Sequence, residues 1–77
     1  MSMHQLDARR LLCPMPVIRT QNMIKTLNPG DILEVTCTDP GVIQDIPAWC
    51  RINGHIFLGY ENVDDEIILK VEVAQVE

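Results

Sequence analysis

The fold follows from a seven-residue stretch, ILEVTCT, at positions 32–38. Every second residue from Leu33 onward is apolar or a cysteine, and the residues between them are polar or charged. Successive side chains of an extended chain face opposite sides. The alternation therefore predicts a strand with one buried face, at the centre of the chain.

Outward from this stretch, the chain shows helix signals on both sides. Pro14 suits the first turn of a helix over residues 14–27, since the first amides of a helix have no internal partner. A second helix is predicted over 39–53, and it stops at Gly54. Three further strands are predicted, at 5–8, 55–62 and 66–73. The element order is βαβαββ.

This order defines an α/β (α+β) fold. A strand–helix–strand unit implies a parallel pair with a right-handed crossover, and the last two strands form an antiparallel hairpin. The sheet is therefore mixed and four-stranded. Both helices are amphipathic and the strands have one apolar side, so we expect the helices on one face of a two-layer sandwich.

Length and composition limit the class of protein. Seventy-seven residues, 47% of them hydrophobic, suit one folded domain over 1–77. One each of Trp, Tyr and Phe is too few for a base-stacking surface. No apolar run approaches the ~18 residues of a membrane span. Three cysteines without a secretory context predict a cytoplasmic protein with reduced thiols.

The net charge of −5 is unevenly distributed. Residues 1–27 hold four basic residues against one acid, and residues 28–77 hold two against ten. The acidic majority disfavours binding to a phosphate backbone as the main task. The basic minority surrounds Cys13, and this is the first indication of a functional site.

Cys13 stands in the motif Cys13-Pro14-Met15-Pro16. A residue before proline avoids helical geometry, so Cys13 should lie at the N-cap of the first helix or one place earlier, facing free N–H groups. The helix dipole changes a thiol pKa only slightly, and Arg9 and Arg10 would add to that effect. We expect a moderately activated, exposed nucleophile.

The other residues narrow its chemistry. Position 16 is proline, so Cys13 has no local resolving thiol, and neither His4 nor His55 stands in a hydrolase arrangement with it. Cys37 and Cys50 fall on apolar faces and are expected in the core. A disulfide between them, or a metal site with His55, is less favoured because the spacing is not that of ligands. The chemistry that remains for Cys13 is exchange with a sulfur atom of another protein. This reaction needs neither a metal nor an organic cofactor.

The motif at 13–17 and the segments 6–8, 29–30 and 39–47 resemble the TusA/SirA-like sulfur-carrier (sulfurtransferase) family, over about residues 6–73. The resemblance implies one such domain, with strand order 1-2-4-3. It also implies that Cys13 carries sulfane sulfur as a persulfide. The donor would be a cysteine desulfurase or rhodanese-type enzyme, and the acceptor would serve, for example, tRNA thiolation or sulfur metabolism. The family usually has glycine at the position of Arg10, where it permits a backbone angle that arginine adopts less readily.

The remaining site residues are expected to serve Cys13. Pro14, Pro16 and Asp7 would position or activate it. The residues expected to dock a partner are Arg9, Arg10, Met15 and Arg19. The chain would act as a monomeric sulfurtransferase without independent turnover. Two alternatives stay open: a regulatory or protein-binding module of the same fold, and an RNA-binding domain.

Overall fold

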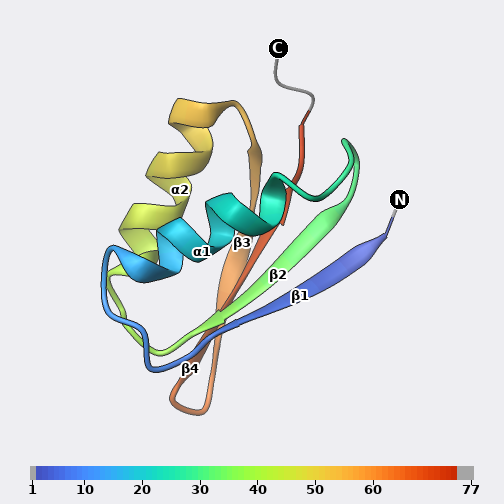
Figure 1. Ribbon diagram of the computed structural model, residues 1–77. Coiled ribbons are helices and arrows are strands. Elements are labelled where there is room, and N and C mark those ends of the chain that lie inside the picture. The colour runs from blue at the N-terminus through green and yellow to red at the C-terminus, as the bar shows by residue number, and fades with distance from the viewer. Residues whose placement is uncertain (1, 75–77) are drawn as a thin grey trace.

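The computed structural model describes residues 2–74 and contains one mixed sheet with two helices. The elements follow the predicted order: β1 (Met3–Ala8), α1 (Met15–Ile24), β2 (Ile32–Cys37), α2 (Val42–Asn53), β3 (Ile56–Val63) and β4 (Glu66–Glu72). The strands lie in the order β1-β2-β4-β3. Figure 1 shows both helices on the same side of the sheet. The two-layer α+β sandwich expected from the sequence is therefore confirmed.

β2 is an inner strand of the sheet. It pairs in parallel with β1, where Ala8 lies opposite Cys37, and antiparallel with β4, where Cys37 lies opposite Ile67. Its predicted apolar side faces the helices and is fully buried. The most buried core residues are aliphatic side chains and two cysteines, each at most 1% exposed: Ala8, Leu33, Val35, Cys37, Val42, Ile46, Cys50, Leu69 and Val71.

Cys37 and Cys50 therefore occupy the core, as expected. Both are free thiols, and burial raises the pKa of each to about 11. A buried thiol behaves as a small apolar side chain.

Helix α1 is shorter than predicted, because it ends at Ile24 rather than Leu27. The amides of Thr26 and Leu27 donate to carbonyls three residues earlier, so the chain leaves the α-helix through tighter turns. Leu27 still packs against the core. At the end of α2, Gly54 adopts the left-handed conformation (φ 80°) and stops the helix as predicted.

The parallel pairing of β1 and β2 brings two loops together. Each strand is followed by a helix, so the loops 9–14 and 38–41 leave the same edge of the sheet (Figure 1). The Arg10 amide donates to Thr38 Oγ1 at 2.9 Å. The Cys13 amide donates to Asp39 Oδ2 at 3.1 Å. These contacts place the start of α1 beside the start of α2.

Arg10 has a left-handed backbone (φ 66°), which side chains with a Cβ adopt at a cost. We expect Arg10→Gly to raise the free energy of unfolding by about 0.5–1 kcal/mol, because the relief of strain exceeds the entropy that glycine adds to the unfolded chain. Urea denaturation of both chains would measure it. Arg9→Gly, which removes ion pairs instead, should lower stability. An unchanged or lower stability for Arg10→Gly would show that the angle is not strained.

Candidate functional site around Cys13

Cys13 is exposed and lies one place before Pro14, which is the N-cap of α1. This is one of the two positions expected for it. The free amides expected beside it are not present at the N-cap or at the first two positions of the helix. Pro14 and Pro16 have no N–H, and the Met15 amide donates to the Leu12 carbonyl at 2.9 Å. The motif fixes the position of the cysteine but provides no amide cluster for an anion there.

Two carboxylates from the other loop and helix hold Cys13 instead. The Cys13 thiol donates to Asp45 Oδ2 at 2.8 Å, and the Cys13 amide donates to Asp39 Oδ2. Asp45 lies in the first turn of α2, and Asp39 precedes that helix. Asp39 also accepts the Gly41 amide at 3.0 Å, and these amides hold the pKa of its carboxyl below the usual value. Asp39 therefore remains ionised.

The carboxylates reverse the expected change in the thiol pKa. The hydrogen bond to Asp45, together with desolvation and the hydrogen bond and charge of Asp39, raises the pKa of Cys13 to about 12. At pH 7 only about one thiol in 10⁵ would be ionised. The prediction of a moderately activated thiolate is therefore wrong for the chain alone. The helix dipole stabilises a thiolate too weakly to offset the effect of two nearby negative charges on the thiol pKa.

Gly41 provides the space in which Cys13 meets α2. A Cβ at this position would lie 3.3 Å from Cys13 Sγ and 3.4 Å from Asp39 Oδ1. Its φ of −58° is ordinary for any residue, so the requirement is for room rather than for a special angle. Any larger residue would crowd the sulfur.

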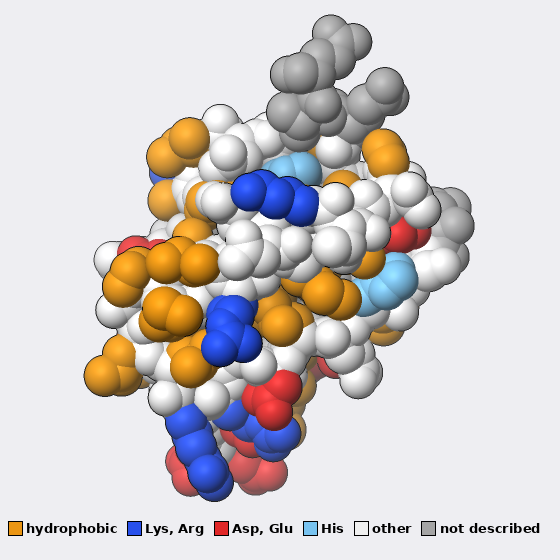
Figure 2. Space-filling view, viewed as in Figure 1, with side chains coloured by type: hydrophobic (Ala, Val, Ile, Leu, Met, Phe, Trp, Pro, Cys, Tyr) orange, Lys and Arg blue, Asp and Glu red, His pale blue; other side chains and the backbone are white. Residues whose placement is uncertain are grey.

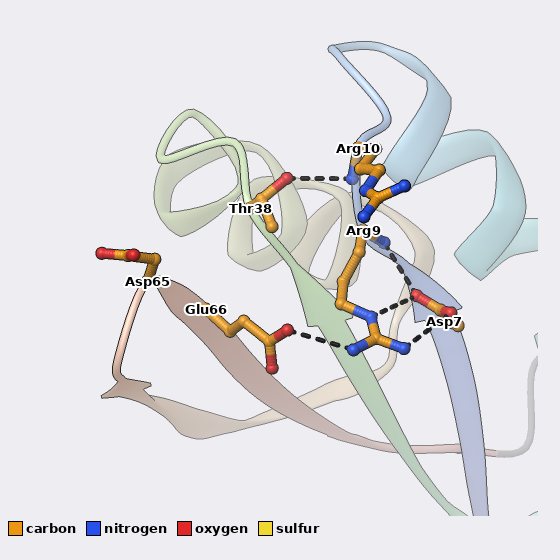
Figure 3. A pocket seen from close by; sticks show the side chains of 6 residues that line it. All are labelled: Asp7, Arg9, Arg10, Thr38, Asp65 and Glu66. Carbon is orange, nitrogen blue, oxygen red and sulfur yellow. Dashed lines mark hydrogen bonds and ion pairs between the residues drawn. The ribbon is translucent and has the colours of Figure 1, made fainter.

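Asp7 and Arg9 contact one another (Figure 3), and within residues 2–74 their side chains form no hydrogen bond or ion pair with Cys13. The Arg9 guanidinium donates to both oxygens of Asp7, at 2.9 and 3.0 Å, and to Glu66 Oε2 at 3.1 Å. These bonds lower the pKa of Asp7 to about 2 and raise the pKa of Arg9. The contacts fix the loop that leads to the cysteine, while the charge of Arg9 is compensated locally.

This group lines a depression of about 500 Å³ together with Arg10, Thr38 and Asp65. In Figure 3 the guanidinium of Arg10 is not joined to the other five residues, and Asp65 points away from Arg9. Cys13 does not line this depression. The predicted site residues are thus divided between two places, the Arg9 ion pairs and the cysteine loop.

An exposed apolar strip runs from the residue before Cys13 onto the first turns of α1. It consists of Leu12 (74% exposed), Met15 (38%) and Ile18 (41%), and Arg19 beside it is also exposed. Figure 2 shows hydrophobic side chains gathered at the left of the molecule, over the loop before α1 and the start of that helix. We call Leu12, Met15 and Ile18 the apolar strip. Of the three, only Met15 was predicted to be a contact residue, although their spacing of three residues could have identified the others.

Asp39 and Asp45 were also missed as site residues. The available signal was topological: parallel strands end at the same edge of a sheet, so the residues that follow each of them meet there. In residues 2–74, no three His, Cys, Asp or Glu side chains are grouped so as to hold a metal ion. Within the same residues, no helix has the length and apolar character needed to cross a membrane.

Residues 4–73 match the family model described as sulfurtransferase TusA, and the chain belongs to that family. A solved structure shares the fold, namely the SirA-like protein from Desulfitobacterium hafniense. Its TM-score is 0.82 at 21% identity, covering 95% of this chain and 100% of that one.

Three curated relatives, each named as a sulfur carrier protein, are similar to this chain in sequence. YrkI of Bacillus subtilis is 46% identical over 65 residues, which are 84% of each chain. The sulfur carrier protein TusA of Pseudomonas aeruginosa (strain LESB58) is 43% identical over 61 residues, 79% of this chain and 71% of that protein. YrkF of Bacillus subtilis is 45% identical over 56 residues, but this chain spans only 30% of its length.

Proposed function

We propose that this protein relays sulfane sulfur as a persulfide on Cys13, between a donor enzyme and an acceptor. One observation carries the proposal: of the three cysteines, Cys13 alone is exposed, whereas Cys37 and Cys50 are buried. Its exposed place just before α1, in a chain that matches the sulfurtransferase TusA model over residues 4–73, adds support.

The proposed step is an exchange between sulfur atoms. The Cys13 sulfur attacks the outer sulfur of a donor persulfide, the S–S bond of the donor breaks, and a new S–S bond forms on Cys13. The proton of the Cys13 thiol ends on the donor sulfur that loses the outer sulfur atom. The exchange between the two proteins therefore involves no net oxidation or reduction. An acceptor thiol takes the sulfur by the same reaction. The step requires no cofactor, and the chain alone turns nothing over.

The donor that we propose is a cysteine desulfurase or a rhodanese-type enzyme, and the acceptor belongs to tRNA thiolation or sulfur metabolism. A partner would dock on the apolar strip with Arg10 and Arg19 around it. Pro14 and Pro16 hold the cysteine at the helix start, and Asp7 holds Arg9 and its loop. We propose that the chain does this as a single-domain monomer.

Mass spectrometry tests the relay. Incubated with a cysteine desulfurase and cysteine, or with a rhodanese and thiosulfate, the protein should gain about 32 Da, one sulfur atom. Peptide mapping should place the added mass on Cys13, and dithiothreitol should remove it. If folded protein gains no mass from several donors of both kinds, the chain is not a sulfur carrier of this type.

A further inference from the structure

The charges that act on the Cys13 sulfur are both negative. Asp45, in α2, accepts the thiol proton, and Asp39, in the loop before that helix, accepts the Cys13 amide and adds a second negative charge near the sulfur. Arg9, in the loop that leads to Cys13, has its guanidinium held by Asp7 and Glu66. Arg10, in the same loop, lines the depression beside Arg9, which Cys13 does not line, and it does not contribute to the shift of the Cys13 pKa. The sulfur is therefore held as a neutral thiol by two carboxylates of the chain itself.

This arrangement makes the free chain a slow nucleophile. Relative to an unperturbed cysteine, the thiolate fraction falls by about three powers of ten. The remaining thiolate is more nucleophilic, but this gain recovers only about half of that exponent. The net effect is a thiol that reacts roughly 30-fold more slowly than an unperturbed one. A sulfur carrier with this site therefore needs a partner group that favours the Cys13 thiolate, and a small neutral reagent has no such group.

We propose that Asp45, assisted by Asp39, keeps Cys13 protonated and protected in the free chain, and that a sulfur-transfer partner releases it by placing a lysine or arginine side chain against this carboxylate pair. This inference rests on the proposed function for the identity of the partner. The restraint by Asp45 itself is a property of the chain alone.

Charge complementarity is the reason for a cationic partner group. A cation that pairs with Asp45 takes over the oxygen that accepts the thiol proton, and it cancels the negative charge that disfavours a thiolate. The same cation would lie close to the sulfur that is attacked, since Asp45 Oδ2 is 2.8 Å from Sγ. The proton released from Cys13 goes to the sulfur that leaves the donor, so the exchange remains balanced.

The first test measures alkylation by iodoacetamide, a neutral reagent, between about pH 7 and pH 10. For the wild type, the rate should rise tenfold per pH unit without a plateau. Asp45→Asn should react about tenfold faster at pH 7, and its profile should bend within this range. Asp65→Asn removes one exposed acid in the β3–β4 turn and serves as the matched control, so it should behave as the wild type does. A profile for Asp45→Asn identical to that of the wild type would overturn the proposal.

The second test uses the unmodified chain, so it decides the question even if the variant fails to fold. The probes are two small disulfides, the cation cystamine and the anion dithiodiglycolate. At about 0.02 M salt, Cys13 should prefer cystamine by about tenfold more than free 2-mercaptoethanol does, and the excess should largely vanish at about 0.5 M. No excess preference would overturn the proposal. Neither test uses a sulfur donor, so a chain that fails to load sulfur can still show the restraint.

Discussion

The Cys13→Ser chain is expected to gain no sulfur from any donor that loads the wild type, because a serine oxygen cannot form the persulfide bond. The substitution should leave the fold intact, since the side chain is exposed and serine adds no bulk. A serine hydroxyl can also donate to Asp45. Intact-mass measurement after incubation with the donor gives the loading. A urea unfolding curve gives the stability, which should change by less than about 0.5 kcal/mol.

Cys37→Ser and Cys50→Ser are the matched controls. Both should load one sulfur as the wild type does, but each should lose about 1–3 kcal/mol of stability, because each places a hydroxyl in the apolar core. Loading of Cys13→Ser at the wild-type level would refute the assignment of the carrier residue.

Removal of two of the three residues of the apolar strip should have the next largest effect. In the double variant Leu12→Ser/Ile18→Ser, sulfur transfer from a protein donor should slow by about tenfold or more, because apolar anchors at the centre of an interface carry most of its binding energy. Serine adds no charge, so the thiol pKa should stay as it is. The iodoacetamide rate should therefore remain within about twofold of the wild-type rate.

Ile52→Ser provides the control for exposed apolar area. Ile52 is 80% exposed near the end of α2, the opposite end of that helix from Asp45. Its loss should leave transfer unchanged. If both variants slow transfer equally, or if neither does, the strip has no special part in docking.

Local sequence patterns were sufficient for most of the fold. The alternation around Leu33 gave the buried side of β2, and the apolar positions of Cys37 and Cys50 predicted their burial. The resemblance to a family that usually has glycine at position 10 indicated a backbone angle suited to glycine there, and the φ of 66° at Arg10 agrees with it. The inferences about β2 and the two cysteines depend only on residues close together in the chain.

The environment of Cys13 depends on residues far apart in sequence, and there the prediction failed. Asp45 is 32 positions from Cys13, and the two meet only because the crossover from β1 to β2 places both loops at one edge of the sheet. The residues next to Cys13 in sequence indicate only a helix dipole and two arginines. They do not indicate that Arg9 pairs with Asp7 and Glu66, or that α2 brings a carboxylate to the thiol.

The burial of Cys37 and Cys50 also determines how the cargo can be lost. A persulfide beside a second thiol of the same chain can close to a disulfide and expel hydrogen sulfide. Here the other two thiols are 0% and 1% exposed, within a close-packed core. For the persulfide that we propose on Cys13, the folded chain therefore has one accessible thiol and no second accessible thiol that could displace the sulfur. Under the same proposal, we expect loading to stop at one sulfur atom per molecule, and we expect the sulfur to leave only by reaction with another molecule.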